Sequence, residues 1–266
     1  MRKRKLIQTI EELSISGQDA ILVKIIDSEE QTLVTEFVLP SISEFSKIEG
    51  LSENPDPENI NNEVWNKIKA PLANYFSELI QKKKETLLKY GDSFIYYLQK
   101  IVATDILILF GGGDINEGIV HIARLLNYEI YLWDDRPEFS TEKYLAGINC
   151  FFEHLNDCIA KLPFSPHCDI VIATRGHKFD LQILKLIHNK PYRYLGIIGS
   201  RKKIKSSFRE VKKISADFDP SNIHAPVGLD IGAKSSKEIA VAIIAEMLAN
   251  KNKIQKIGFM KERLNT

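Results

Sequence analysis

A run of glycines followed at a distance by an acid is the first pattern in the chain that could do chemistry. Gly111, Gly112 and Gly113 follow an apolar stretch, and Asp134 comes 23 residues after Gly111. Glycines at such a place let a phosphate approach the backbone N–H groups that begin a helix, and the acid can accept hydrogen bonds from a ribose. The pattern indicates a nucleotide or phosphate site. The alternative is that the glycines only close a tight turn.

Two residues beside the glycines depart from the dinucleotide-binding pattern. Asn116 stands where that pattern has Gly or Ala, which allow a helix to pack closely on the sheet. Asp114 adds a negative charge where an anion would bind. A pyrophosphate bound in the usual pose is therefore not the expectation at this loop.

A second cluster, Thr174-Arg175-Gly176-His177, is followed by Asp180. Arg can hold a phosphate through two parallel hydrogen bonds, and His titrates near neutral pH. An acid one helical turn later can orient the imidazole of His177. The alternative is that Thr174 and Asp180 cap the following helix and that His177 is a solvated loop residue.

A third cluster, Gly199-Ser200-Arg201-Lys202-Lys203, places three cations at the expected start of a helix. We expect Ser200 to cap this helix, so that the positive helix end and the cations together favour a phosphate. The alternative is a solvated basic helix start.

A fourth cluster lies in a loop that contains Pro226, Gly228 and Gly232, which indicate a fixed backbone course. Asp230 lies among apolar residues of this loop, and such an acid is costly to bury unless it binds something.

The final helix is expected to begin after this loop. Ser235 and Glu238 have the spacing of a capping box. Glu238 and Glu246 are interpreted as possible helix surface.

The first three clusters each follow an apolar run of strand length, and helical patterns separate the runs. This alternation predicts an α/β fold with a Rossmann-like parallel sheet and helices on both faces. Ligands bind such a sheet at the carboxyl ends of its strands, where all four clusters are expected to lie. The expected strands are 106–110, 129–133, 169–173 and 194–198, and the expected helices are 117–126, 179–188 and 236–250.

Before residue 100 the pattern differs. Residues 21–26 and 32–39 predict two short strands joined by a polar turn. Residues 63–83 predict one apolar helical face, interrupted by Pro71. We therefore expect a small α+β domain over residues 1–100 and a Rossmann-like domain over residues 101–266.

Composition limits the function classes. The chain of 266 residues carries a net charge of +1, which argues against a general nucleic-acid binder because such affinity needs concentrated Lys and Arg. No apolar run approaches the ~18 residues of a membrane span, so we expect a cytoplasmic protein without a membrane partner. Cys150, Cys158 and Cys168 match neither a disulfide framework nor a zinc site, which predicts reduced thiols.

Three long stretches resemble the XdhC/CoxI family, the accessory proteins of xanthine dehydrogenase and related molybdenum hydroxylases. They are 174–181, 194–203 and 226–246, and Gly111–Gly113 and Asp134–Phe139 extend the likeness to roughly residues 105–250. Where members of the family usually have His and Thr-Pro, this chain has Asp114 and Ser235-Ser236. The first hundred residues lack the N-terminal signatures of the family, which suggests a degenerate N-terminal domain.

The resemblance implies an accessory factor that binds molybdenum cofactor (molybdopterin), or a related nucleotide, and assists maturation of a xanthine dehydrogenase-type hydroxylase. It would be a cofactor chaperone rather than a turnover enzyme. Because unpaired strand edges are usually covered, the N-terminal strands make a homodimer plausible.

Two alternatives stay open. One is an NAD(P)-dependent oxidoreductase that binds an NAD(P)-like dinucleotide at the Gly111–Gly113 loop, with Asp134 on the ribose and His177 as acid or base. The other is a non-catalytic nucleotide-binding regulatory module. We expect no catalytic and no metal-ligating residues. The candidate cofactor-binding residues are Gly111, Gly112, Gly113, Asp114, Asp134, Arg136, Thr174, Arg175, Gly176, His177, Gly199, Ser200, Arg201, Lys202, Gly228 and Asp230.

Overall fold

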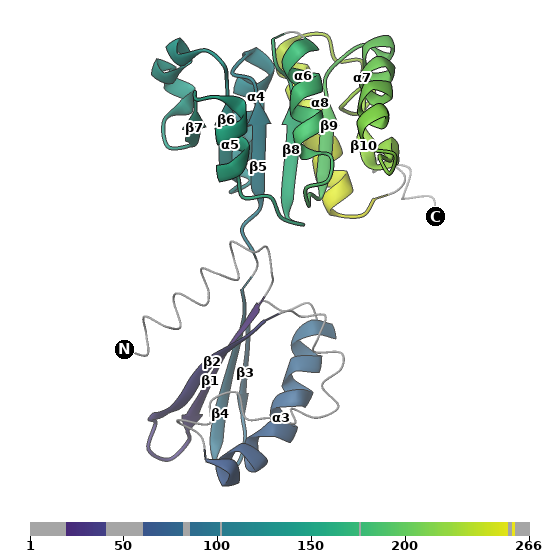
Figure 1. Cartoon of the computed structure of the whole chain (residues 1–266). Helices are drawn as coiled ribbons and strands as arrows, with labels where there is room; N and C mark the ends of the chain where they lie inside the picture. Colours follow the sequence, from purple (N-terminus) through teal and green to yellow (C-terminus); the bar gives the residue numbers. More distant parts are fainter. Residues whose placement is uncertain are drawn as a thin grey trace. The chain divides into compact units, whose positions relative to one another are not determined.

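The chain divides into two compact units, Met1–Ala103 and Thr104–Thr266 (Figure 1). The structure is a computed structural model that describes residues 20–40, 61–81, 86–101, 103–175, 177–254 and 257–258. The assignment of the first unit to a degenerate family domain stays a prediction.

Six parallel strands form the sheet of the C-terminal unit, in the order β10-β9-β8-β5-β6-β7. If these strands are numbered 1 to 6 in chain order, from β5 to β10, their order across the sheet from β7 to β10 is 3-2-1-4-5-6. This is the Rossmann strand order. The strand order reverses between β5 and β8, so the loops after these two strands flank the crevice. The strands are β5 (Ile106–Phe110), β6 (Glu129–Trp133), β7 (Asn149–Phe151), β8 (Cys168–Ile172), β9 (Tyr194–Ile197) and β10 (Ile223–His224).

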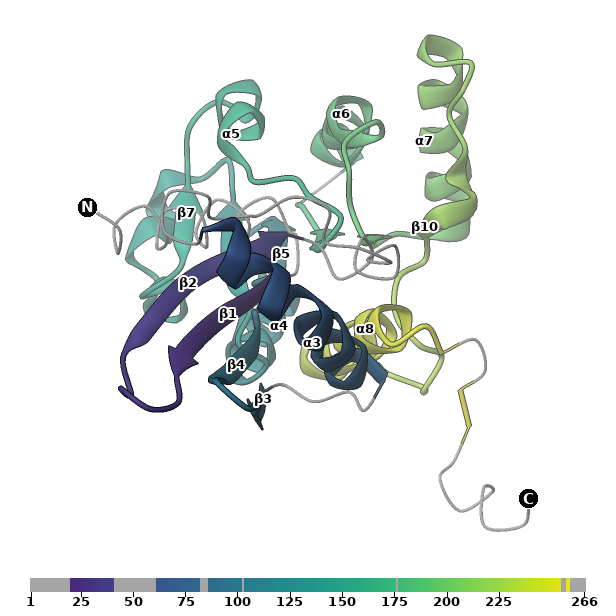
Figure 2. The same cartoon turned by 90° about the horizontal axis from the view of Figure 1, so that it is seen from below.

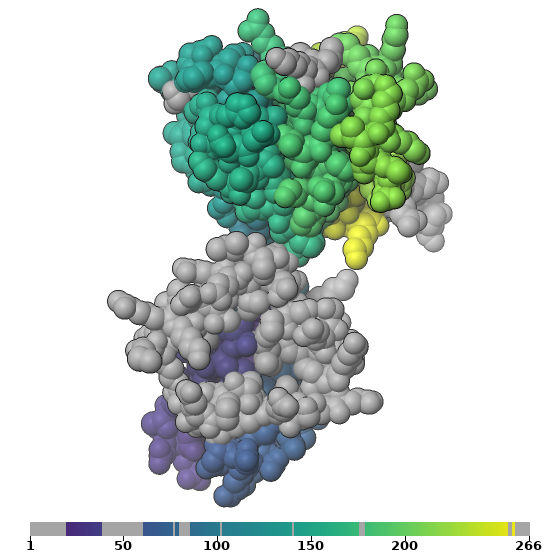
Figure 3. Space-filling view, in the orientation of Figure 1, coloured from purple at the N-terminus to yellow at the C-terminus, as the bar shows by residue number. Residues whose placement is uncertain are grey.

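Helices cover both faces of this sheet because its central strands are apolar on both sides. In β5, Ile106, Ile108 and Phe110 pack toward α5, α6 and α7, whereas Leu107 and Leu109 pack toward α4 and α8. Figure 2 shows these two helix layers on opposite sides of the strands, and Figure 3 shows the side chains of α5, α6 and α7 closing over one face. The helices are α4 (Asp114–Leu125), α5 (Leu155–Lys161), α6 (His177–Ile187), α7 (Arg201–Ile214) and α8 (Ser236–Lys251).

Short 3-10 helices lie in the connections of this unit. They are η1 (Pro137–Thr141), η2 (Lys143–Leu145) and η3 (Pro220–Asn222).

The N-terminal unit is an antiparallel sheet, ordered β2-β1-β4-β3, with α3 on its apolar face. Alternate residues of the central strand β1, namely Ile21, Val23 and Ile25, are buried against α3. The edges are β2 and β3, and the homodimer expected from an unpaired edge stays a prediction. The elements are β1 (Ala20–Asp27), β2 (Leu33–Pro40), α3 (Asn62–Gln81), β3 (Thr86–Tyr90) and β4 (Phe94–Ile101).

The predicted α/β class, the four predicted strands and the first hairpin are confirmed. The predicted interruption of the helix at Pro71 was wrong, because α3 continues through that residue. Ile68 and Leu72 on either side are fully buried, and this packing outweighs the lost backbone hydrogen bond. The sequence patterns did not reveal β3, β4, β7, β10 or α5. None of the helices in the described ranges combines the length and apolar character needed to cross a membrane.

Trp65→Phe is expected to change the free energy of unfolding by less than about 1 kcal/mol. Trp65 is buried in α3, and its indole N–H has no hydrogen-bond partner within the described residues. Removing an unsatisfied buried donor offsets much of the lost apolar contact. Urea unfolding of the two proteins checks this, and a loss above about 2 kcal/mol would show that the N–H has a partner in the folded chain.

Candidate functional site

The glycine loop joins β5 to α4 at the carboxyl edge of the sheet. Gly111 has φ +106°, and a Cβ there would lie 2.4 Å from the Ala173 carbonyl oxygen at the end of β8. A Cβ at Gly112 would lie 2.8 Å from the Phe139 ring. Gly113 faces open space, with no atom within 4 Å of a Cβ. Gly111 and Gly112 are therefore required by packing, and Gly113 is where a ligand can approach.

Asp134 is buried, and its carboxylate is already saturated by the protein. It accepts hydrogen bonds from Gly112 N at 2.5 Å, from Arg136 Nε at 2.7 Å and from Arg136 Nη2 at 2.8 Å. The Arg136 guanidinium also lies 3.9 Å from the centre of the Phe139 ring. Burial raises the pKa of Asp134, but the bonds from Arg136 and Gly112 outweigh it and hold the pKa below its usual value.

This arrangement bears on the expected ribose contact. Both Asp134 oxygens hold the glycine loop and Arg136, so the carboxylate has no free face for a sugar hydroxyl. Tyr144 supports the same loop by donating to the Gly112 carbonyl at 2.7 Å. The structure thus gives Asp134 and Arg136 a positioning role in the loop.

Asn116 also acts on the loop. Its amide donates to the carbonyl oxygens of Phe110 and Gly111 at 3.2 and 2.6 Å, and the side chain is buried. Close helix packing, expected near position 116, occurs at Gly118 instead, where a Cβ would lie 2.8 Å from the Ala240 side chain of α8. Asp114, expected in the turn, is the exposed first residue of α4. Glu117 in the same turn adds a second acid, so the start of α4 disfavours an anion.

The second cluster lies beside the glycine loop, at the end of β8. Thr174 donates to Asp180 Oδ1 at 2.5 Å, which ties the loop to the first turn of α6. Arg175 is exposed. Gly176 and the side chain of His177 lie outside the described residues.

The third cluster begins α7, as expected, but Ser200 does not cap it. Ser200 occupies the N-cap position, yet its hydroxyl accepts no hydrogen bond from the first turn. The N–H groups at this helix end therefore have no side-chain acceptor from the cap. Arg201 and Lys202 are exposed, and no ion pair involving them occurs in the described part of the chain. Gly199 precedes them and is half-buried.

The fourth cluster adjoins the end of β9, where Val227 N donates to Ile197 O at 3.2 Å. Gly228 has φ +98°, which favours glycine. Asp230, an acid that would be costly to bury, is exposed in this loop and carries no burial cost. The capping box is confirmed: Ser235 accepts from Glu238 N, and Glu238 accepts from Ser235 N at 2.8 Å.

The four clusters therefore occupy one edge of the sheet. Gly111 lies against Ala173, Ile198 N donates to Ile172 O at 2.9 Å, and Val227 bonds to Ile197. These contacts join the ends of β5, β8 and β9 to the last loop. The edge combines exposed cations, an open glycine and an uncapped helix start.

Comparison with known proteins supplies the family. A model of the XdhC Rossmann domain matches residues 107–247, which is more than half of the chain. This chain belongs to the XdhC family. Over 162 residues it is 28% identical to a protein of Bacillus subtilis (strain 168) named as a probable xanthine dehydrogenase subunit, covering 59% of this chain and 46% of the relative. Over 149 residues it is 31% identical to the uncharacterized protein YqeB of Escherichia coli (strain K12), covering 55% and 27%.

The chain thus matches less than half the length of these two curated relatives. A crystal structure from Bacillus halodurans, described as a xanthine dehydrogenase, superposes with a TM-score of 0.54 at 16% identity. That likeness covers 93% of this chain and 94% of the other, and it supports the fold.

Glu246 organises the last loop of this XdhC-family chain, although its sequence suggested helix surface. Its carboxylate accepts from Tyr194 Oη at 2.5 Å and from Gly228 N at 2.9 Å, and it lies 3.2 Å from His224 Nδ1. Burial raises the pKa of Glu246, but these hydrogen bonds outweigh it and hold the pKa below its usual value. The loop is thereby fixed to α8 and β9.

Glu246→Gln is expected to lower the free energy of unfolding at pH 7 by about 1–3 kcal/mol, since charge-assisted hydrogen bonds are lost. The folded-state pKa is below the unfolded value, so this stabilisation is present above the usual carboxyl pKa and is lost as the pH falls through the folded-state pKa. Urea unfolding at pH values from 7 to 3 should show that the difference in free energy of unfolding between the parent and Glu246→Gln becomes smaller as the pH falls. Glu210→Gln on the surface of α7 is the matched control, and equal effects of both variants would contradict the assignment.

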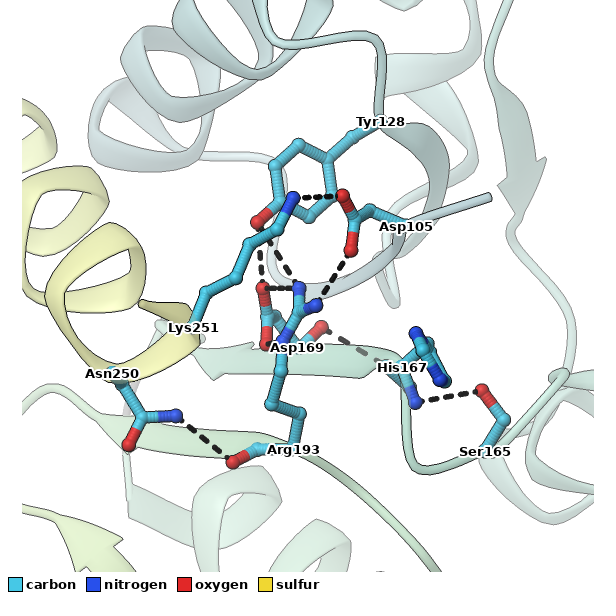
Figure 4. Close-up of polar contacts among 9 residues, drawn as sticks. Asp105, Tyr128, Ser165, His167, Asp169, Arg193, Asn250 and Lys251 are labelled. Carbon is cyan, nitrogen blue, oxygen red and sulfur yellow. Dashed lines mark hydrogen bonds and ion pairs between the residues drawn. The ribbon is translucent and has the colours of Figure 1, made fainter. Parts of the chain in front are cut away.

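A polar network at the opposite edge of the sheet went unnoticed in the sequence (Figure 4). Arg193, just before β9, donates to both carboxylate oxygens of Asp169 at 2.9 and 2.6 Å and to Asp105 at 2.6 Å. Tyr128 donates to Asp169 at 2.7 Å, and Lys251 at the end of α8 pairs with Asp105. The network joins the amino ends of four strands, β5, β6, β8 and β9, to the end of α8, away from the ligand edge. We therefore assign it to stability.

The thiols of this chain are not activated. Burial raises the pKa of Cys158 to about 12 and also raises the pKa of Cys150 and Cys168. Because the thiolate is the reactive form, these cysteines are poor nucleophiles near neutral pH. Their positions on β7, α5 and β8 indicate structural roles.

Proposed function

We propose that this chain is an accessory factor that binds molybdenum cofactor, or a related anionic nucleotide, and assists maturation of a xanthine dehydrogenase-type hydroxylase. The observation that carries the proposal is the group of exposed cations at the carboxyl edge of an XdhC Rossmann domain. Arg175 follows β8, and Arg201 and Lys202 follow β9. Family membership and the name of the Bacillus subtilis relative support the link to xanthine dehydrogenase.

The residues at this edge fit the phosphate of such a cofactor. Arg175, Arg201 and Lys202 are cations without a described ion pair, and the α7 N–H groups lack a side-chain cap. A phosphate would lie at the β8 and β9 ends, because the acids Asp114 and Glu117 begin α4. When bound, molybdenum cofactor would supply the metal centre that the hydroxylase needs, and Arg175, Arg201 and Lys202 would hold its phosphate.

The proposed role is that of a chaperone and not of a sulfur donor. Sulfur transfer requires a reactive thiolate, and burial raises the pKa of each of the three thiols. The occupied carboxylate of Asp134 also speaks against ribose binding as in NAD(P)-dependent oxidoreductases.

The test is calorimetric titration of the full chain with molybdenum cofactor released from a donor enzyme, and in parallel with NAD(H) and NADP(H). Binding of the pterin at micromolar concentration, without nicotinamide binding, is the expected result. Preference for a nicotinamide would favour an oxidoreductase. Binding of none of these ligands would favour a regulatory module that has lost the cofactor.

Arg175→Ala and Arg201→Ala are each expected to weaken cofactor binding by about 1.5–3 kcal/mol, the value of one charge-assisted hydrogen bond. Arg209→Ala, at an exposed position further along α7, is the matched control and is expected to leave affinity unchanged. The same titration measures all three variants. Unchanged affinity in both site variants would exclude the proposed phosphate position.

A further inference from the structure

A cavity of about 560 Å³ lies between the end of β6, the segment after β7, α5 and α6, and none of the candidate cofactor-binding residues is among its lining. Trp133, the last residue of β6, lies on its wall and immediately precedes Asp134. Phe179 also lies on its wall, in the first turn of α6, next to Asp180. The volume is that of a small-ligand pocket. The strand that precedes Asp134 and the helix that follows the second cluster thus also build this cavity.

Aromatic side chains line the cavity: Phe152 and Phe179 are partly exposed, whereas Trp133 is only 2% exposed and lies behind them. The Trp133 indole donates to the Glu153 carbonyl at 2.9 Å, and its ring packs edge-to-face on Phe179 at 5.4 Å between centres. Phe152, at the end of β7, lines the same space. Flat heterocycles stack favourably on such side chains. The walls therefore suit the ring system of a cofactor.

The polar lining of the cavity includes two carboxylates, Asp135 and Glu153, together with His154, Asn156, Gln182 and Lys185. Asp135 is exposed, and Arg136 Nε, its partner of opposite charge in the described part of the chain, is 4.0 Å away. Glu153 pairs with Lys161 at 2.7 Å through Oε2, whereas Oε1 is buried without a partner in the described ranges. Ionised carboxylates only accept hydrogen bonds. A ring that presents two adjacent N–H donors would satisfy this wall.

We propose that this cavity binds the heterocycle of the anionic cofactor, and that it selects the amino-oxo pyrimidine edge shared by guanine and pterins. That edge offers neighbouring N–H donors to a carboxylate. Adenine places a ring acceptor beside its amino group, which a carboxylate repels. The inference rests on the proposed function, in which Arg175 and Arg201 bind the phosphate of the same ligand. Asp135 is assigned as the specificity-determining residue.

The test uses Trp133 as its reporter. In Trp65→Phe, Trp133 is the only tryptophan of the full chain. Its fluorescence is titrated with GDP, with ADP and with neopterin, which carries the pterin ring without phosphate. GDP and neopterin are expected to quench Trp133, and GDP is expected to bind about tenfold or more tightly than ADP, as for one charged hydrogen bond.

Variants separate the ring from the phosphate. Asp135→Asn should abolish the preference for GDP over ADP and leave ADP affinity unchanged. Phe179→Leu should weaken both nucleotides about tenfold through lost stacking. Phe164→Leu, a partly buried phenylalanine on the same core outside the cavity, is the control and should not weaken either.

The outcomes distinguish this inference from the proposed function. Equal affinity for GDP and ADP in the parent protein, or an unchanged preference in Asp135→Asn, would overturn the ring assignment. Calorimetry could show that GDP and ADP bind without changing Trp133 fluorescence and that Arg175→Ala weakens the affinity for both. The phosphate site would then stand, and the cavity assignment would fall. Absence of binding by all three probes would overturn the ring assignment, and the titration with molybdenum cofactor would decide the proposed function separately.

Discussion

Arg193→Ala is expected to lower the free energy of unfolding of the C-terminal unit by about 3–5 kcal/mol, the cost of removing one partner from a buried ion pair. Asp169 is fully buried, and its carboxylate takes two of its three described hydrogen bonds from Arg193. Without the guanidinium, an ionised carboxylate would stay in an apolar interior. The loss is large because the partner is removed while the charge remains.

The pH dependence of this variant follows from the same contacts. Burial raises the pKa of Asp169, and the paired guanidinium of Arg193 opposes that rise. Removing Arg193 raises the folded-state pKa further, so Asp169 can bind a proton in the folded state at higher pH than in the unfolded chain. Folding of the variant is therefore penalised above the unfolded-state pKa, and the penalty grows until the pH exceeds the folded-state pKa.

Urea unfolding followed by Trp133 fluorescence in the Trp65→Phe background measures this unit specifically. The difference in free energy of unfolding between Arg193→Ala and its parent should become smaller as the pH is lowered from 7 to 4.5. Arg209→Ala provides an exposed arginine as control. A loss below about 1 kcal/mol at pH 7 would mean that the network contributes little.

Gly111→Ala is expected to lower the free energy of unfolding by about 3 kcal/mol or more, through backbone strain and overpacking. The residue has φ +106°, and the added Cβ would lie 2.4 Å from the Ala173 carbonyl oxygen. Backbone atoms at the end of β8 cannot move away as a flexible side chain can. The loop and the end of β8 would separate, which would also impair ligand binding.

Gly113→Ala is the matched control two residues along the same loop. Gly113 has φ −82° and open space around a Cβ, so its stability should change by less than about 1 kcal/mol. Thermal unfolding and calorimetric titration are measured on both variants. If the two alanines destabilised the chain equally, the close approach at Gly111 would not be the cause.

Much of the fold could be predicted because its signals are local. The strand Ile106–Phe110 is apolar at every position, which indicates burial on both faces, and the observed strand has those bounds. The capping box of Ser235 and Glu238 depends on residues three apart and was equally predictable. The first three clusters follow β5, β8 and β9. They could be placed at one edge of the sheet because the carboxyl ends of parallel strands lie together.

The roles of individual polar residues were less predictable, because partners lie far apart in sequence. Asp134 looked like a ribose acceptor, and only the folded chain shows its oxygens held by Gly112 and Arg136. Asp230 has apolar neighbours in the sequence, yet the folded loop exposes it to solvent. Ser200 has the right type and position for a cap but accepts no bond there.

By itself, then, the sequence determined the Rossmann-like alternation, the edge of the sheet that carries the clusters and the resemblance to the XdhC family. Only the tertiary structure decided that Arg193 joins Asp105 to Asp169, that Glu246 holds the last loop, and that Trp133 lines a cavity. The physical reason is the separation along the sequence of the residues that interact. Periodicity and strand ends are properties of neighbouring residues, whereas a buried charge pair or a cavity wall exists only after distant elements have packed together.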